Sequence, residues 1–148
     1  MLAYKPDLVI VSFGTNDAGA GLPGLEQYKN SLDGIFSKLK EKGCDVIFLS
    51  SVLKNVYVSN KLTDPTLREI AAQQVTLVEQ DMDAIYFDEA KKLCDKYGFL
   101  FCDCHAKWKK MRENGVDTTV LLSNHLNHPI RELHWLFATS LVEMIFEN

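Results

Sequence analysis

The chain has 148 residues, of which 47% are hydrophobic and 24% are charged, and its net charge is −4. This composition is typical of an ordinary globular domain, and a chain of this length buries enough surface to fold without disulfides or a structural metal. The mild acidity and the lack of a Lys- and Arg-rich face argue against nucleic acid or an anionic membrane as a partner. No segment approaches 18 consecutive apolar residues, so no membrane span is expected.

The first residues of the chain and its cysteines bear on the cellular compartment. Residues 2–6 lack the basic and apolar regions of a secretory signal peptide, so we expect either a cytoplasmic protein or a chain whose start has been trimmed. The four cysteines are spaced irregularly, which favours reduced thiols over a disulfide framework.

The first third of the chain predicts a strand, a loop, a helix and a second strand. Residues 8–13 are an almost unbroken apolar run, typical of a strand buried on both faces of a parallel sheet. Residues 18–24 hold three glycines and a proline, so we expect a loop there. Apolar side chains recur with helical period over residues 25–42, and residues 46–49 repeat the buried-strand signature.

A long helical segment follows in the middle of the chain. Asp64 and Pro65 resemble an N-cap followed by proline at the first helical position. Helical periodicity then extends from Thr66 to Tyr97, which is too long for one ordinary globular helix. We therefore expect an interruption near residues 79–83.

The last third predicts one strand and two helices. Residues 99–102 predict a third short strand, and residues 106–112 predict a brief helix. A last helix is expected to begin at Pro129. Four apolar residues spaced four apart should be its buried face: Leu133, Phe137, Leu141 and Ile145.

Strands that alternate with helices indicate an α/β fold. Such a pattern implies βαβ units, right-handed crossovers and a doubly wound parallel sheet with helices on both faces. We expect residues 1–148 to be a single domain. Three strands are few for a sheet of this kind, so we expect strands on the N-terminal side to be missing.

Two polar segments occupy places where an α/β protein binds ligands. Gly14-Thr15-Asn16-Asp17 follows the first predicted strand, at the carboxyl edge of the sheet. Asn124-His125-Leu126-Asn127-His128 precedes the last predicted helix. Each segment also has a plain structural interpretation, because Asn and Asp form turns after strands and Asn127 or His128 could cap a helix.

Together, the two segments resemble a known enzyme family. The sequences KPDLVIVSFGTND and NHLNHPIRELHWLFA resemble the third and last conserved blocks of the SGNH, or GDSL-type, hydrolases, a family of esterases and acylhydrolases. In that family the third block reads G-x-N-D, and the last block carries a catalytic histidine before proline. The resemblance extends over essentially the whole chain and implies a flavodoxin-like fold.

The resemblance implies roles for particular residues. Asn16 matches the oxyanion-hole asparagine, whose side-chain N–H stabilises the tetrahedral intermediate. His128 matches the general base, and a helix beginning at Pro129 would direct its positive end towards that imidazole. Gly14 would permit a close approach of the backbone, and Asp17 would brace the turn.

The last block departs from the family pattern at the acid of the triad. The family has an aspartate three residues before the histidine, whereas this chain has His125 there, with Asn124 beside it. A backbone carbonyl or a distant carboxylate such as Asp117 could orient His128. The alternative is a Ser-His dyad.

The nucleophile is the second departure. The family's G-D-S block lies before the G-x-N-D block, and none of the eight serines of this chain has a G-D-S context. We therefore expect the nucleophilic serine upstream of this chain. Ser12 is expected to lie within the first strand. Ser123, on a loop near His128, is therefore the only serine of this chain with a suitable position to replace the missing nucleophile.

A metal site is the main competing constellation. Cysteines and histidines could gather at one end of the sheet, but no C-x-x-C pair or H-x-x-x-H spacing is present: Cys102, Cys104, His105, His125, His128 and His134. We therefore expect no metal, and the resemblance implies no cofactor.

The resemblance implies hydrolysis of a small-molecule carboxylic ester, with an acyl or acetyl group, through a serine acyl-enzyme. The alternative is a truncated or degenerate domain without catalysis, which binds a partner or oligomerises. Without the family's first strand, the strand at residues 8–13 would have an unpaired edge, so a homodimer through that edge or poor solubility is expected of the chain alone.

Overall fold

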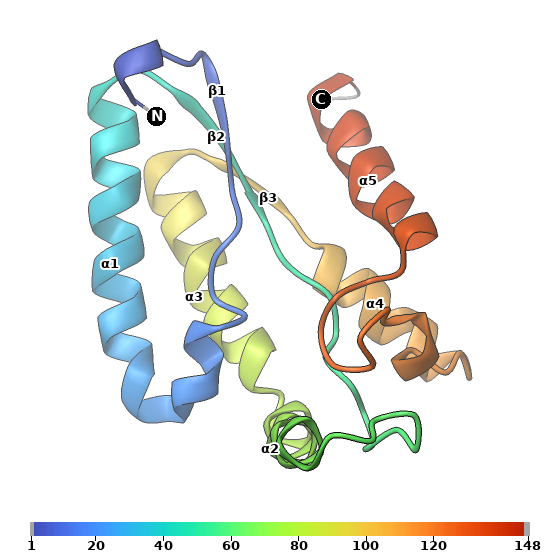
Figure 1. The fold of residues 1–148 in the computed structure, drawn as a ribbon. Coiled ribbons are helices and arrows are strands. Elements are labelled where there is room, and N and C mark those ends of the chain that lie inside the picture. The colour runs from blue at the N-terminus through green and yellow to red at the C-terminus, as the bar shows by residue number, and fades with distance from the viewer. Residues whose placement is uncertain (1, 147–148) are drawn as a thin grey trace.

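The computed structural model describes residues 2–146, whose three strands form one parallel sheet (Figure 1). Its strands are β1 (Leu8–Val11), β2 (Asp45–Leu49) and β3 (Leu100–Cys102), in the order β1-β2-β3. Val9 pairs with Val46, and Phe48 pairs with Phe101. The predicted neighbours, residues 8–13 and 46–49, are therefore adjacent in the sheet, although β1 ends at Val11.

Helices cover both faces of the sheet, as the α/β prediction requires. Figure 1 shows α1 (Gly21–Glu41) and α3 (Met82–Tyr97) on one face and α5 (His134–Phe146) on the other. At the carboxyl end of the strands lie α2 (Pro65–Glu79) and α4 (Cys104–Glu113). Four short 3-10 helices complete the described elements: η1 (Leu2–Tyr4), η2 (Asp17–Ala20), η3 (Thr119–Leu121) and η4 (Arg131–Leu133).

The main core lies between the sheet and the α1/α3 layer. Phe48 of β2 is fully buried, and its ring stacks on Phe101 and meets Phe36 of α1 edge-on. Val9 and Val11 alternate inward from β1 against the same layer. Burial of this apolar surface fixes α1 and α3 on the sheet.

The opposite face of the sheet is covered only in part. Ile47 of β2 is buried beneath α5, where it packs near Phe137 and Leu141. On β1, however, Leu8 and Ile10 point to the same face as Ile47 and remain 40% and 47% exposed. The prediction that this strand is buried on both faces is therefore wrong for residues 2–146, because the outer face of β1 is only partly covered.

The loop predicted at residues 18–24 is largely helical. The 3-10 helix η2 occupies Asp17–Ala20, and α1 begins at Gly21. Pro23 lies in the first turn of α1, where a backbone N–H is not needed. A Cβ at Gly24 would lie 2.8 Å from the Tyr86 hydroxyl, so this glycine allows close helix packing and does not signal a loop.

The last helix starts later than predicted. Pro129 pairs with Leu122 in an isolated antiparallel bridge, and the Ile130 N–H donates to the Leu121 carbonyl at 2.9 Å. These contacts hold the segment extended, so α5 begins only at His134. Of the predicted buried face, three residues are half-buried and one, Ile145, is 41% exposed: Leu133, Phe137, Leu141 and Ile145.

The expected break in the middle of the chain is confirmed. Glu79 ends α2, Met82 begins α3, and between them Asp81 has a φ of 52°. The Asp64 carboxylate accepts a hydrogen bond from the Leu67 N–H at 3.0 Å, and so caps α2 as the sequence predicts.

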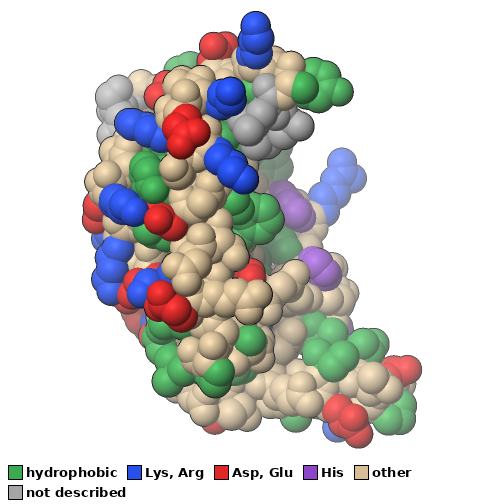
Figure 2. All heavy atoms as spheres, turned by 90° about the vertical axis from the view of Figure 1, so that its left-hand side faces the viewer, with side chains coloured by type: hydrophobic (Ala, Val, Ile, Leu, Met, Phe, Trp, Pro, Cys, Tyr) green, Lys and Arg blue, Asp and Glu red, His purple; other side chains and the backbone are tan. Residues whose placement is uncertain are grey.

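The surface of the α1 layer carries charges of both signs. Figure 2 shows basic and acidic side chains interspersed over the face that includes α1, and two of its ion pairs are Lys29–Glu26 and Lys96–Asp33. Within residues 2–146, no helix is long and apolar enough to cross a membrane.

The turn after β1 requires glycine at position 14. Gly14 has a φ of 115°, and a Cβ there would lie 3.0 Å from the Tyr28 hydroxyl and 3.2 Å from Cε1 of Phe87. Tyr28 and Phe87 are both buried, so neither ring can move aside without disturbing the core.

We predict that Gly14→Ala lowers the free energy of unfolding by about 2 to 4 kcal/mol, because it combines backbone strain with overpacking. Urea denaturation would measure the change. Gly19→Ala is the matched control in the same turn, since a Cβ there meets nothing within 4 Å and should change stability by no more than about 0.5 kcal/mol. Equal stabilities of the two variants would contradict the prediction.

Candidate active site

The turn that follows β1 presents the side chain of Asn16. The Asp17 carboxylate accepts from the Gly14 N–H at 3.1 Å, and the Ala18 N–H donates to the Gly14 carbonyl at 2.8 Å. These bonds close the turn, so the geometry supports a bracing role for Asp17. The exposed Asn16 side chain makes no hydrogen bond within residues 2–146, which leaves its N–H groups available to a ligand.

Asn124 organises the loop that carries His128. Its side-chain oxygen accepts from the N–H groups of residues 126, 127 and 128 at 3.0 to 3.1 Å, and its amide donates to the Asn127 side chain. His125 adopts a φ of 54°, which tightens the loop, and its Nδ1 is buried without a partner. Asn124 and His125 thus shape the loop, and His128 stands exposed at its end.

One cavity brings the two predicted segments together. Residues 12–17, Ser51, Asn127 and His128 line a cavity of about 210 Å³ at the carboxyl edge of the sheet. Asn16 and His128, which are 112 positions apart in the sequence, therefore border the same space.

The surroundings of His128 differ from those expected. Because α5 begins at His134, six residues later, its N-terminus is not at His128, and the predicted helix-dipole effect on the imidazole is wrong. Within residues 2–146, the His128 ring has neither a hydrogen bond nor an ion pair to a carboxylate. Asp117 is engaged elsewhere, where it accepts from the Tyr57 hydroxyl at 2.8 Å and the Thr119 N–H at 3.0 Å.

The serines near the cavity also differ from expectation. The Ser123 hydroxyl donates to the His128 carbonyl at 3.2 Å and is not part of the cavity lining. Ser12 lies beyond the end of β1 and not within the strand, and it lines the cavity together with Ser51. Ser123 is therefore not the only local serine with a suitable position.

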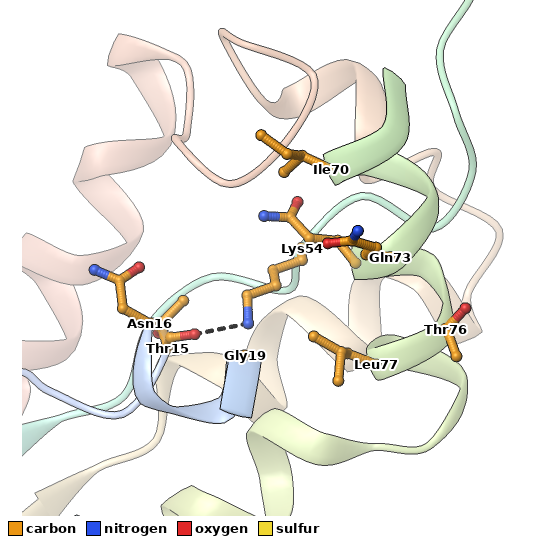
Figure 3. Close-up of a pocket in the computed structure, with 9 residues that line it drawn as sticks. Thr15, Asn16, Gly19, Lys54, Ile70, Gln73, Thr76 and Leu77 are labelled. Atoms are coloured by element: carbon orange, nitrogen blue, oxygen red, sulfur yellow. Dashed lines mark hydrogen bonds between the residues drawn. The ribbon is translucent and has the colours of Figure 1, made fainter. Parts of the chain in front are cut away.

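A second, larger cavity adjoins the Asn16 turn. It has a volume of about 500 Å³ and lies between that turn and α2, with Thr15 and Asn16 in its wall (Figure 3). Lys54 also borders it, and its ammonium donates to the Thr15 carbonyl at 2.7 Å and to Asp83 at 2.8 Å. Lys54 was not predicted as a site residue, and its one signal in the sequence is that it is a lone cation in the apolar stretch of residues 52–58.

The cysteines and histidines do not gather into a metal centre. No group of three or more potential ligands is present in the described part of the chain, residues 2–146. Cys102 and Cys104 are buried with their sulfur atoms 3.9 Å apart, and their hydrogen bond lowers the pKa of the Cys104 thiol. His105 is buried with Nδ1 3.2 Å from the Val52 carbonyl, and burial lowers the pKa of its imidazole.

Comparison with solved structures shows the same fold in esterases. A catalytic mutant of Axe2, an acetylxylan esterase from Geobacillus stearothermophilus, superposes with a TM-score of 0.69 at 17% identity, over 99% of this chain and 62% of that one. A candidate GDSL-like lipase from Parabacteroides merdae gives a TM-score of 0.67 at 18% identity, over 96% of this chain and 61% of that one. This chain thus spans about 62% of the length of the first of these structures.

Sequence comparison identifies the family. No curated protein sequence matches the chain. The profile of the GDSL-like Lipase/Acylhydrolase family matches residues 1–136, which include both the Asn16 turn and the His128 loop. The chain therefore belongs to the GDSL-like lipase/acylhydrolase family.

Proposed function

We propose that this chain supplies the oxyanion donor and the general base of a serine-dependent carboxylic ester hydrolase. The observation that carries the proposal is the shared cavity of Asn16 and His128, since a hydrolase needs both groups around one carbonyl. Family membership and the esterase fold of the similar structures support the same reaction class.

His128 would act as the base in acylation and as the acid in leaving-group departure. It takes the proton of the serine hydroxyl while the serine oxygen attacks the ester carbonyl, and the Asn16 side-chain N–H donates to the resulting oxyanion. Collapse of the intermediate breaks the bond to the alcohol oxygen, which receives the proton from His128. Water then repeats the sequence, releasing the acid and the free serine.

The nucleophilic serine is proposed to come from a segment upstream of this chain, next to β1. Ser12, Ser51 and Ser123 are the local serines closest to the site, but none has the G-D-S context of the family. Because no carboxylate bonds to the His128 ring within residues 2–146, we propose that His128 works as part of a Ser-His dyad, with the Asn124 loop holding it in place.

The substrate proposed is a small-molecule ester with an acetyl or other short acyl group. A cavity of about 210 Å³ is large enough for such a group. Axe2, to which the chain is similar in fold, is an acetylxylan esterase, so an acetyl ester of a carbohydrate is a suitable first compound to test. None of the proposed steps requires a cofactor.

We predict that hydrolysis of p-nitrophenyl acetate requires the chain extended upstream to include the G-D-S segment. In that protein, Asn16→Ala should lower kcat by about 10²–10³ with little change in KM, because its donor acts in the transition state. His128→Ala should remove nearly all turnover, and His125→Ala should lower turnover by a smaller factor.

His134→Ala is the control, since His134 lies at the start of α5 and outside the cavity lining. Full activity of the His128→Ala protein would show that another group is the base. Turnover by the chain of 148 residues that is lost in Ser12→Ala, Ser51→Ala or Ser123→Ala would contradict an upstream nucleophile.

A second candidate function is association without catalysis, favoured by the exposed face and edge of β1. In the described sheet β1 pairs only with β2, so its other edge offers free N–H and C=O groups. Ile10 and Phe13 are 47% and 54% exposed beside that edge. We propose that the chain of 148 residues alone forms a homodimer through this edge.

We predict a dimer by light scattering for the chain of 148 residues, and a shift towards monomer in Ile10→Lys. A charge on the outer face of β1 opposes burial of that face in an interface. Val120→Lys is the matched control, because Val120 is 48% exposed but lies on η3, away from β1. A stable monomer of the unsubstituted chain would contradict the dimer.

A further inference from the structure

A buried lysine ties the Asn16 turn to the rest of the protein. Lys54 follows β2 and is only 3% exposed, and its ammonium has two partners, the Thr15 carbonyl at 2.7 Å and the Asp83 carboxylate at 2.8 Å. Asp83 is also 3% exposed and lies in the first turn of α3. The contact therefore joins three separate elements: the turn after β1, the loop after β2 and the start of α3.

This arrangement is not explained by stability. Removing two charges from water is costly, and replacing a buried ion pair by apolar residues of similar volume is often neutral or stabilising. Lys54 satisfies its pair with Asp83 and also donates to a main-chain carbonyl of the turn that carries the oxyanion donor. The hydrogen bond from Lys54 to the Thr15 carbonyl is the feature that an apolar pair could not reproduce.

The bond to Thr15 controls the orientation of Asn16. The Thr15 carbonyl belongs to the peptide group whose nitrogen is that of Asn16, so fixing its direction fixes the backbone from which the Asn16 side chain projects. The bonds of Gly14 to Asp17 and Ala18 close the turn on itself but do not attach it to α3 or β2. In Figure 3 the Asn16 side chain points away from Lys54, so Lys54 acts on it only through the backbone.

We propose that Lys54 is a positioning residue, which holds the Thr15–Asn16 peptide so that the Asn16 amide faces the cavity shared with His128. The inference rests on the proposed function for the role of Asn16. Lys54 itself contacts Thr15 and Asp83 and has no place in the lining of the His128 cavity.

The test is the backbone order parameter of Asn16, measured by ¹⁵N relaxation on the chain of 148 residues. Lys54→Met/Asp83→Asn removes both charges at nearly constant volume. The order parameter of the Asn16 N–H should fall from about 0.85, typical of rigid backbone, towards 0.6. Asp83→Asn alone is the control: it removes the ion pair but keeps the donor to Thr15, so Asn16 should stay rigid.

The control separates positioning from a general effect on stability. Asp83→Asn leaves a buried ammonium without its carboxylate and should lose more stability in urea denaturation than the double variant. Only the double variant, which lacks the ammonium, should loosen Asn16, while the Asn124 N–H stays unchanged in both. An unchanged Asn16 order parameter in the double variant overturns the proposal. If that variant does not fold, Lys54→Leu/Asp83→Asn replaces it, because leucine also removes the donor to the Thr15 carbonyl.

A kinetic measurement on the upstream-extended protein completes the test. There the double variant should lower kcat for p-nitrophenyl acetate at least tenfold at unchanged KM, since substrate binding does not use Lys54. An equal loss in the Asp83→Asn protein would overturn the proposal. The order parameter needs no turnover, so its result stands even if the extended protein hydrolyses no ester and the proposed function fails.

Discussion

The loop that follows β2 is the constraint on which the candidate site depends. From two neighbouring residues it binds both halves of the site: the Lys54 ammonium donates to the Thr15 carbonyl at 2.7 Å, and the Asn55 N–H donates to the Leu126 carbonyl at 2.8 Å. The Asn55 side chain also donates to the Ala71 carbonyl at 2.9 Å, which anchors the loop on α2. Both Lys54 and Asn55 are buried. The same buried loop therefore holds the two site segments in place.

The fold could be predicted from the sequence where the signal is local. The apolar strands and the Asp64 cap depend on residues close in sequence, and both are present. The predicted start of α1 was wrong because the glycine and proline content of residues 18–24 indicated a loop. Gly24 is instead needed for packing against Tyr86. The predicted start of α5 was wrong because the bridge between Leu122 and Pro129 is a tertiary contact, which the spacing of apolar residues in the sequence does not reveal.

The two polar segments of the candidate site were proposed from the sequence, whereas the residues that support them were not. Asn16 and His128 were identified by their resemblance to family blocks, and they line one cavity. Lys54 and Asp83 are 29 positions apart, and neither lies in a recognisable motif, so their pairing follows only from the packing of α3 against the loop after β2. The role of Asp117 also depended on tertiary structure, since Tyr57 and Thr119 take the carboxylate that was considered a partner for His128.

The open edge of β1 connects the two candidate functions. In a parallel sheet the carboxyl ends of neighbouring strands lie at the same edge, so a strand paired in parallel with the free side of β1 would end beside the Gly14–Asp17 turn. The residue after that strand would then stand next to the cavity of Asn16 and His128. If the proposed nucleophile follows such a parallel strand, pairing at this edge would also bring it into reach, whereas an antiparallel copy of β1 would satisfy the same edge without delivering one. The direction of the added strand thus decides whether association at β1 builds an active site or only an interface.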